Sequence, residues 1–186
     1  MNKEELTVAL AGLSANRVLQ SVVIIEKNNI DINDLLELSL HRQKEIAFRA
    51  AWMLEYLLTN QAVLFSAYLT RFLDFLPEQY NPSAMRHFSK MVAMITDRKA
   101  DSCYQQLVKQ IDFAPLIELL FTHLIDPQTL VATKVHCMQA LANLAPRYEW
   151  IKEELPYTID HLITVESIAF FARAKMVRKQ LKRSPI

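Results

Sequence analysis

Apolar residues recur along the chain at the three- and four-residue spacing of α-helices, and they are densest in the stretch Ile46–Leu76. Apolar positions there cover far more than one face of each of two predicted helices, which a polar break at Thr59-Asn60-Gln61 separates. The second helix has only a narrow polar stripe, formed by Ser66, Thr70 and Asp74 with Arg71 beside it. A helix with so little polar surface needs neighbours on several sides, so we expect stacked helical hairpins.

Capping residues and prolines predict where the other helices begin and end. Asn81-Pro82 is the strongest start, because a capping asparagine precedes a proline at the first helical position. Gly12 is expected to close the first helix, Thr164 to cap the last, and Pro156 to kink or split the helix that contains it. The predicted helices span residues 3–12, 14–27, 35–40, 46–58, 62–76, 82–96, 102–110, 113–125, 128–144, 147–163 and 165–182.

No low-complexity linker interrupts the 186 residues, so we predict one all-α domain over 1–186. Its helices group into four hairpins and a basic C-terminal helix, with boundaries at 1–41, 42–80, 81–126, 127–164 and 165–186. The buried positions of these hairpins are predicted to include Leu54, Leu57, Phe65, Leu69, Leu73, Leu120 and Leu141.

The first helices of the hairpins share a spacing of residue types. Arg49 stands five residues before Leu54 and eight before Leu57, and the same order recurs around Arg17, Arg86 and His136. The stretches FRAAWMLEYL, MRHFSKMVAM and VHCMQALANL resemble the first helices of HEAT and armadillo repeats, whose units are ~40–47 residues long. The resemblance implies a right-handed α-α superhelix, with a compact helical bundle as the alternative fold. Two roles are open for the basic residues at these positions. They could form a ladder of ligand-binding groups, or they could pair with carboxylates or backbone carbonyls between repeats, and we favour pairing.

Composition narrows the chemistry that the chain can perform. Gly12 is its only glycine, which disfavours a β-rich fold and excludes the glycine-rich loops that bind nucleotide phosphates. Cys103 and Cys137 stand alone, and no histidine pair has the spacing of a zinc helix, so we expect no metal and no cofactor. No apolar run reaches the ~18 residues that a membrane span needs, and Glu4 and Glu5 precede the first apolar run, so we expect a cytoplasmic protein.

Among proteins of the HEAT-like class, alkylpurine DNA glycosylases place aromatic residues and a carboxylate around a damaged nucleotide. Trp52 and Trp150 do not reproduce that arrangement residue by residue, and residues 1–164 hold 15 Lys+Arg against 19 Asp+Glu, whereas DNA-binding faces are usually basic. We therefore predict a non-catalytic protein-interaction or scaffold module with a concave helical surface. The alternative is a HEAT-like nucleic-acid-binding protein or a glycosylase-like enzyme.

Two surfaces are candidates for contact with another protein or peptide. The first comprises the polar stripes of the second helices, which are Ser66, Thr70, Arg71, Asp74, Glu118, Thr122 and His123. The second is the C-terminal helix, where residues 165–186 carry six Lys+Arg against one acidic residue. Its exposed basic arc includes Lys175, Arg178, Lys179 and Lys182. This helix is interpreted as a cap on the end of the array, and the alternative is that it also docks an acidic partner.

Overall fold

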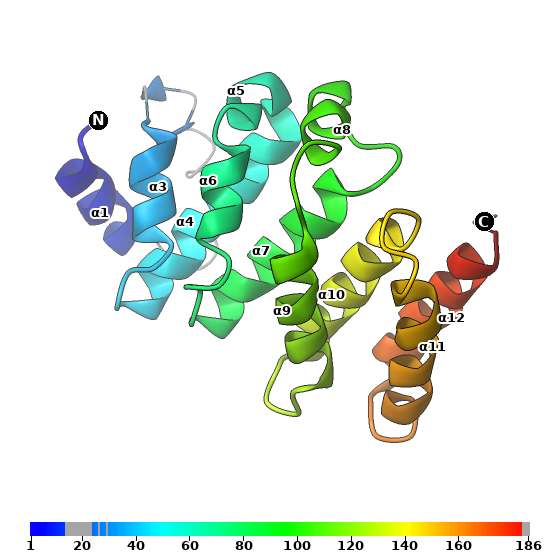
Figure 1. Cartoon of the computed structure of the whole chain (residues 1–186). Coiled ribbons are helices and arrows are strands. Elements are labelled where there is room, and N and C mark those ends of the chain that lie inside the picture. Colours follow the sequence, from blue (N-terminus) through cyan, green and yellow to red (C-terminus); the bar gives the residue numbers. More distant parts are fainter. Residues whose placement is uncertain (14–23, 26, 29, 184–186) are drawn as a thin grey trace. The chain divides into compact units, whose positions relative to one another are not determined.

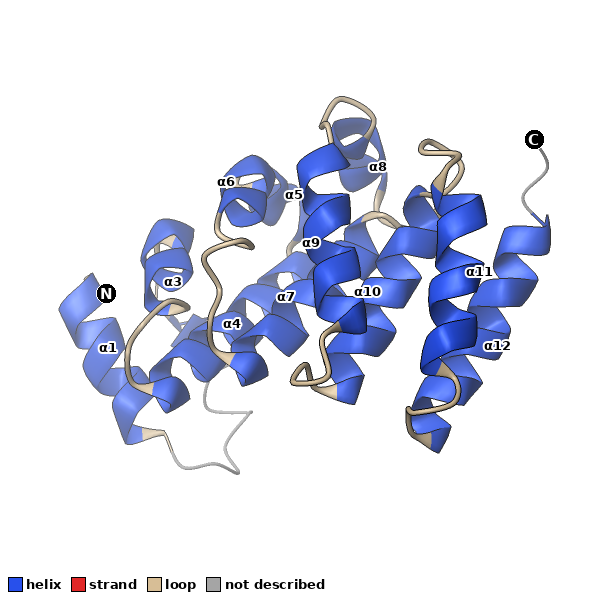
Figure 2. Cartoon of the chain, turned by 60° about the horizontal axis from the view of Figure 1, so that its bottom comes forward, coloured by secondary structure: helices blue, strands red, loops and turns tan. Residues whose placement is uncertain are grey.

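The computed structural model describes residues 1–13, 24–25, 27–28 and 30–183, and in these residues all regular structure is helical (Figures 1 and 2). The helices are α1 (Lys3–Gly12), α3 (Ile32–Leu38), α4 (Lys44–Asn60), α5 (Ala62–Ser66), α6 (Leu69–Asp74), α7 (Pro82–Ile95), α8 (Ser102–Val108), α9 (Ala114–Ile125), α10 (Val131–Leu144), α11 (Ile151–Leu162) and α12 (Ile168–Arg183). The prediction of an all-α chain is confirmed for this part of the sequence. Most of the predicted helix 14–27, with Arg17, lies outside the described residues.

Side-chain caps begin several helices as predicted. The Asn2 side chain accepts a hydrogen bond from the Glu5 backbone N–H at 2.9 Å, and the Glu5 carboxylate accepts one from the Asn2 N–H at 3.0 Å. Asn81 Oδ1 accepts from the N–H groups of Ser83 and Ala84 at the start of α7. Asp31 and Asp101 cap α3 and α8 in the same way. These bonds satisfy amide groups that have no partner within a helix.

The predicted helix 62–76 is instead two short helices, α5 and α6, separated at Ala67-Tyr68. Tyr68 leaves the helical region with φ −105° and ψ 4°, and its N–H donates to the carbonyl of Phe65, only three residues back, at 2.9 Å. The Ser66 hydroxyl donates to the Val63 carbonyl at 2.7 Å, which is the kind of local bond that competes with helix continuation. Ser66 therefore does not share one continuous helix with Thr70 and Asp74.

Three other helices begin later than predicted. Asp126 accepts a hydrogen bond from the Gln128 N–H at 2.9 Å, and this turn delays α10 until Val131. Helix α11 begins at Ile151 and continues through Pro156 without a break. The Thr164 hydroxyl donates to the carbonyl of His161 at 3.0 Å rather than capping α12, which begins at Ile168. Gly12 does end α1, but the next residue is extended and no described residue has a positive φ.

The first of two compact units comprises residues 1–88. In it α4 packs against α1, α3 and α5 (Figure 1). The Arg49 guanidinium donates to the carbonyl oxygen of Leu10 at 2.6 Å, so it satisfies the last turn of α1, and the expectation that this residue pairs between helices is confirmed. The rings of Phe65, Phe72 and Phe88 form the aromatic centre of this unit and are fully buried.

The second unit comprises residues 89–186, and α10 lies at its centre in contact with α9, α11 and α12. A chain of amides links three helices here. The Asn143 side chain donates to the carbonyl of Ala93 in α7 at 2.9 Å, and it accepts hydrogen bonds from the side chains of Gln139 and Gln180 at 2.9 Å each. These bonds fix the position of α12 on α10.

All seven leucine and phenylalanine positions that the sequence assigned to the core are buried. Leu69 is representative, because it is 1% exposed and lies at the start of α6. Leu69→Ala is expected to lower the free energy of unfolding by about 2–5 kcal/mol, since it removes buried methyl groups and leaves a cavity. Urea denaturation followed by circular dichroism measures this change. A denaturation midpoint equal to that of the parent protein would contradict the assignment.

Candidate functional site

The two faces of α12 have opposite chemical character. Phe170, Ala174 and Val177 are fully buried against the second unit. Because successive helical residues turn by ~100°, the opposite arc carries basic residues, of which Lys175, Lys179, Lys182 and Arg183 are exposed. The sequence predicted this division, and Lys175, Lys179 and Lys182 lie on the exposed basic arc, with Arg178 half-buried at its edge.

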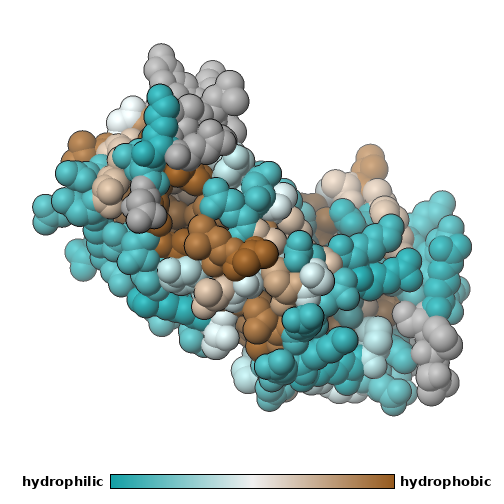
Figure 3. All heavy atoms as spheres, turned by 90° about the horizontal axis from the view of Figure 1, so that it is seen from above, coloured by the Kyte–Doolittle hydropathy of each residue, from teal (hydrophilic) through white to brown (hydrophobic). Residues whose placement is uncertain are grey.

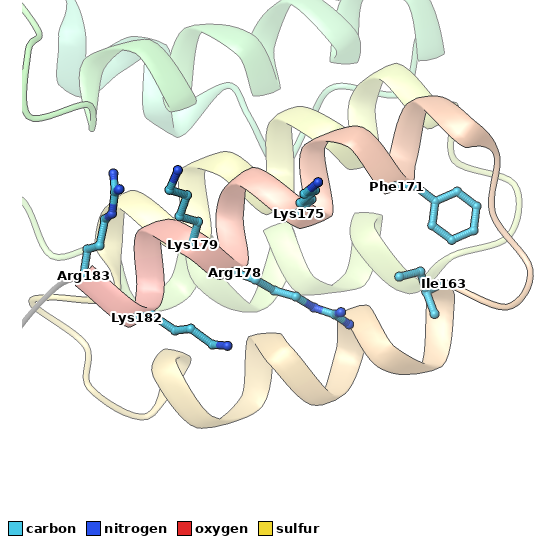
Figure 4. Close-up of a pocket in the computed structure, with 7 residues that line it drawn as sticks. All are labelled: Ile163, Phe171, Lys175, Arg178, Lys179, Lys182 and Arg183. Carbon is cyan, nitrogen blue, oxygen red and sulfur yellow. The ribbon is translucent and has the colours of Figure 1, made fainter.

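A groove of about 650 Å³ runs along this face of α12 (Figure 4). Its lining residues are Ile163, Phe171, Lys175, Arg178, Lys179, Lys182 and Arg183. Ile163 and Phe171 lie at one end, and the cations occupy the rest of its length. Arg178 and Lys182 point toward α11, whereas Lys179 and Arg183 point away from it. The groove thus combines a small apolar end with an extended positive surface.

The cations of the groove differ in their partners. Arg178 forms an ion pair with Asp160 of α11, which fixes its guanidinium beside that helix. Among the described residues, no carboxylate lies within salt-bridge distance of Lys175, Lys179, Lys182 or Arg183. Four exposed positive charges therefore line α12 without a carboxylate partner in this part of the chain. Such an arrangement attracts anionic groups, and the attraction weakens as salt is added.

Residues far from α12 in the sequence hold the helix in place. The Lys134 ammonium of α10 lies 2.5 Å from the Glu166 carboxylate, and their side chains are 2% and 11% exposed. Arg173 donates to the side-chain oxygen of Gln139 at 3.0 Å, which adds to the amide chain around Asn143. The sequence analysis missed the Lys134–Glu166 pair. Its only signal was a lysine at a position that falls on the buried face of the predicted helix.

Apolar side chains also reach the surface on α12. Ile168 is 84% exposed and Met176 is 60% exposed, and both lie on the arc opposite the buried residues. Figure 3 shows that such side chains appear in patches among mainly hydrophilic ones on the face it views. Isolated apolar residues on a surface are ordinary, but here Ile168 lies on the same arc as the basic residues, nearer the helix N-terminus, and Met176 lies among them. The sequence analysis did not single them out.

The polar stripes predicted on the second helices belong to different units. Thr70, Arg71 and Asp74 are exposed and Ser66 is half-buried in the first unit. Arg71 lies 3.4 Å from the Glu37 carboxylate and over the ring of Phe75, so part of its charge is compensated.

In the second unit Glu118 and Thr122 are exposed, and the Thr122 hydroxyl donates to the carbonyl of Glu118 at 2.9 Å. His123 is half-buried, and burial lowers the pKa of its imidazole, an effect that the nearby Asp126 charge opposes. His123 is therefore less solvated than its place on a polar stripe suggested. Exposed polar side chains of this kind are normal on amphipathic helices, so neither stripe is favoured over the groove as the site.

Two groups that could perform acid–base or nucleophilic chemistry, His87 and Cys137, are buried in the fold. His87 Nδ1 lies 2.6 Å from a carboxylate oxygen of Glu55, and the ring is buried against Phe48. Burial raises the pKa of the Cys137 thiol to about 12, so this cysteine stays protonated and unreactive near neutral pH. Within the described ranges, no three of the His, Cys, Asp and Glu side chains are grouped as a metal site requires, and no helix combines the length and hydrophobicity needed to cross a bilayer.

Comparisons with models of protein families, with curated proteins and with solved structures found no match to this chain. The groove brings five cationic side chains together, and the Lys134–Glu166 ion pair ties the segment just before its helix to α10. This groove is the candidate functional site.

Proposed function

We propose that the chain is a non-catalytic protein-interaction module built from HEAT-like helical hairpins, and that it binds a partner through α12. The observation that carries the proposal is the set of four exposed cations without a carboxylate partner among the described residues, Lys175, Lys179, Lys182 and Arg183. These charges are presented by a helix that is already ordered. Binding then avoids most of the entropy cost of ordering a flexible segment.

The spacing of the contacts within each unit supports the repeat architecture. In the first unit, Arg49 contacts Leu10, 39 residues away, and the Gln79 amide donates to the carbonyl of Ser39, 40 residues away. In the second unit, Arg147 donates to the carbonyl of Val108, again 39 residues away. Stacked repeats of two helices produce contacts at such a recurring separation. A right-handed superhelix of these hairpins is the architecture that we propose.

The test removes the charge of the groove and leaves its buried face intact. The variant K175E/K179E/K182E changes exposed side chains only, so it should fold like the parent protein. A matched control, R98E/K99E/K109E, makes the same change in net charge at exposed positions between α7 and α9. Affinity purification from the native cell, followed by reconstitution with the purified partner, should give a complex with the parent and with the control, and none with the groove variant.

Two results would contradict the proposed function. One is that every protein captured by the parent protein is also captured by the groove variant. The other is that the control variant loses the partner to the same extent, because the effect would then come from net charge and not from the groove. Circular dichroism of all three proteins establishes that folding is equal.

A further inference from the structure

We propose that the partner places an acidic amphipathic helix along α12, with its apolar residues on the N-terminal half of α12 and its carboxylates on the C-terminal half. This inference rests on the proposed function and adds the chemistry and the direction of the bound segment. It follows from how the exposed arc of α12 is divided along the helix axis.

The N-terminal half of the exposed arc is apolar. Ile168 and Phe171 are exposed there, together with Ala169 and Ala172, and the exposed Met176 lies at the boundary with the C-terminal half. Ile163, at the end of the groove, extends this surface beyond α12 itself. A polar or uniformly charged ligand would leave these side chains in contact with water. A ligand that covers them with its own apolar residues gains ~25 cal/mol for each Å² of apolar surface that it buries.

The C-terminal half of the same arc is cationic. Lys175 and Met176 lie at the boundary between the two halves, and Lys179, Lys182 and Arg183 follow them to the end of α12. From Ile168 to Arg183 the arc is about 22 Å long, at 1.5 Å per residue, which matches a partner helix of about 16 residues. The partner therefore needs carboxylates over one half of that length and aliphatic side chains over the other.

The direction of the partner helix follows from helix electrostatics. Acidic residues are most favourable in the first turns of a helix, where the partial charge of the helix dipole is positive. A partner whose acidic half is its N-terminal half meets the cations at the C-terminus of α12 only if it runs antiparallel to α12. This arrangement also places the two helix dipoles in opposite directions.

Other occupants fit the surface less well. A second copy that docked through its own α12 would bring an equally cationic face, because the acidic residue of this segment, Glu166, is already bound to Lys134. A lipid bilayer would require the main apolar stripe of α12, but Phe170, Ala174 and Val177 are buried in the unit. A nucleic acid would use the cations, but its phosphates make no use of Ile168 and Met176. An acidic amphipathic helix uses both halves.

The experiment titrates the 186-residue protein into fluorescein-labelled synthetic peptides and measures anisotropy. One peptide has glutamates in its N-terminal half and leucines in its C-terminal half. The reference peptide has the same residues interleaved, so that neither half is apolar. We expect the divided peptide to bind about tenfold tighter, which corresponds to ~1.4 kcal/mol. A single-stranded RNA and vesicles of phosphatidylcholine with phosphatidylserine are titrated in parallel.

Two sets of variants separate the halves of the surface. K175E/K179E/K182E should abolish binding of the divided peptide, whereas I168S/M176S should reduce it about tenfold and leave the binding of the interleaved peptide unchanged. Equal affinity for the two peptides, or no effect of I168S/M176S, would overturn the proposal. So would tighter binding of the RNA or of the vesicles, or self-association of the protein that K175E/K179E/K182E abolishes.

The outcome also distinguishes this inference from the function on which it rests. If neither peptide binds but binding of the purified cellular partner still depends on Lys175, Lys179 and Lys182, the groove binds a protein of another kind. In that case only the inference of an acidic helix is wrong. If that partner binds K175E/K179E/K182E as tightly as the parent protein, both the inference and the proposed function are wrong.

Discussion

Lys134→Met is expected to destabilise the protein by about 3–5 kcal/mol, because it removes the partner of a largely buried carboxylate. The Lys134 and Glu166 side chains are 2% and 11% exposed, so solvent can replace little of the lost interaction. Methionine preserves most of the apolar stem of lysine, so the change tests the charge more than the packing. Urea denaturation followed by circular dichroism gives the difference in free energy of unfolding.

The double variant K134M/E166L is the control for this prediction. A buried ion pair that is replaced as a whole by apolar side chains often costs little, whereas the loss of one partner is costly. The double variant should therefore be more stable than Lys134→Met alone. Equal stability of the two variants would show that the carboxylate of Glu166 is well solvated without its partner. Since Glu166 lies just before α12, partner binding should weaken in Lys134→Met as well.

Phe72→Ala is the corresponding prediction for the first unit, with an expected loss of about 3–5 kcal/mol. The Phe72 ring lies between two others, with centroids 5.9 Å from that of Phe65 and 5.0 Å from that of Phe88. Its removal deprives both neighbours of contacts and leaves a cavity at the aromatic centre. The fluorescence of Trp52, which lies in the same unit, follows the unfolding if Trp150 is replaced by phenylalanine in all samples.

Val63→Ala is the control for Phe72→Ala, because Val63 is 79% exposed in the same unit. Exposed substitutions of this type usually change stability by less than ~0.5 kcal/mol. If Phe72→Ala and Val63→Ala have the same denaturation midpoint, the three rings do not form the stabilising centre of the unit.

The sequence predicted those helices whose ends carry a local chemical signal. Asn81-Pro82 identifies the start of α7, and Asp101 the start of α8, because a cap acts within a few residues of its own position. The break at Ala67-Tyr68 was missed since neither proline nor glycine marks it. The turn at Asp126, which delays α10, was missed because it depends on a side-chain hydrogen bond to the Gln128 N–H, and no glycine or proline between Gln128 and Val131 marks the later helix start.

The candidate site was predictable only in part for a similar reason. The basic arc of α12 is visible in one short stretch of sequence, because residues four apart lie on one face. The Arg178–Asp160 ion pair and the Lys134–Glu166 pair join residues 18 and 32 positions apart, and nothing in the spacing of single residues selects these partners over others. The apolar half of the exposed arc was missed because a helix pattern assigns apolar residues to the core by default.

Helix α7 has a consequence for attempts to divide the protein. The boundary between the two units, after Phe88, falls inside this helix and not in a linker. A cut there would create two new helix ends, with about four N–H and four C=O groups left without helical partners. A fragment that represents either unit therefore has to contain all of Pro82–Ile95. The two units cannot be exchanged between proteins as interchangeable modules, and duplication of one unit would have to copy the shared helix with it.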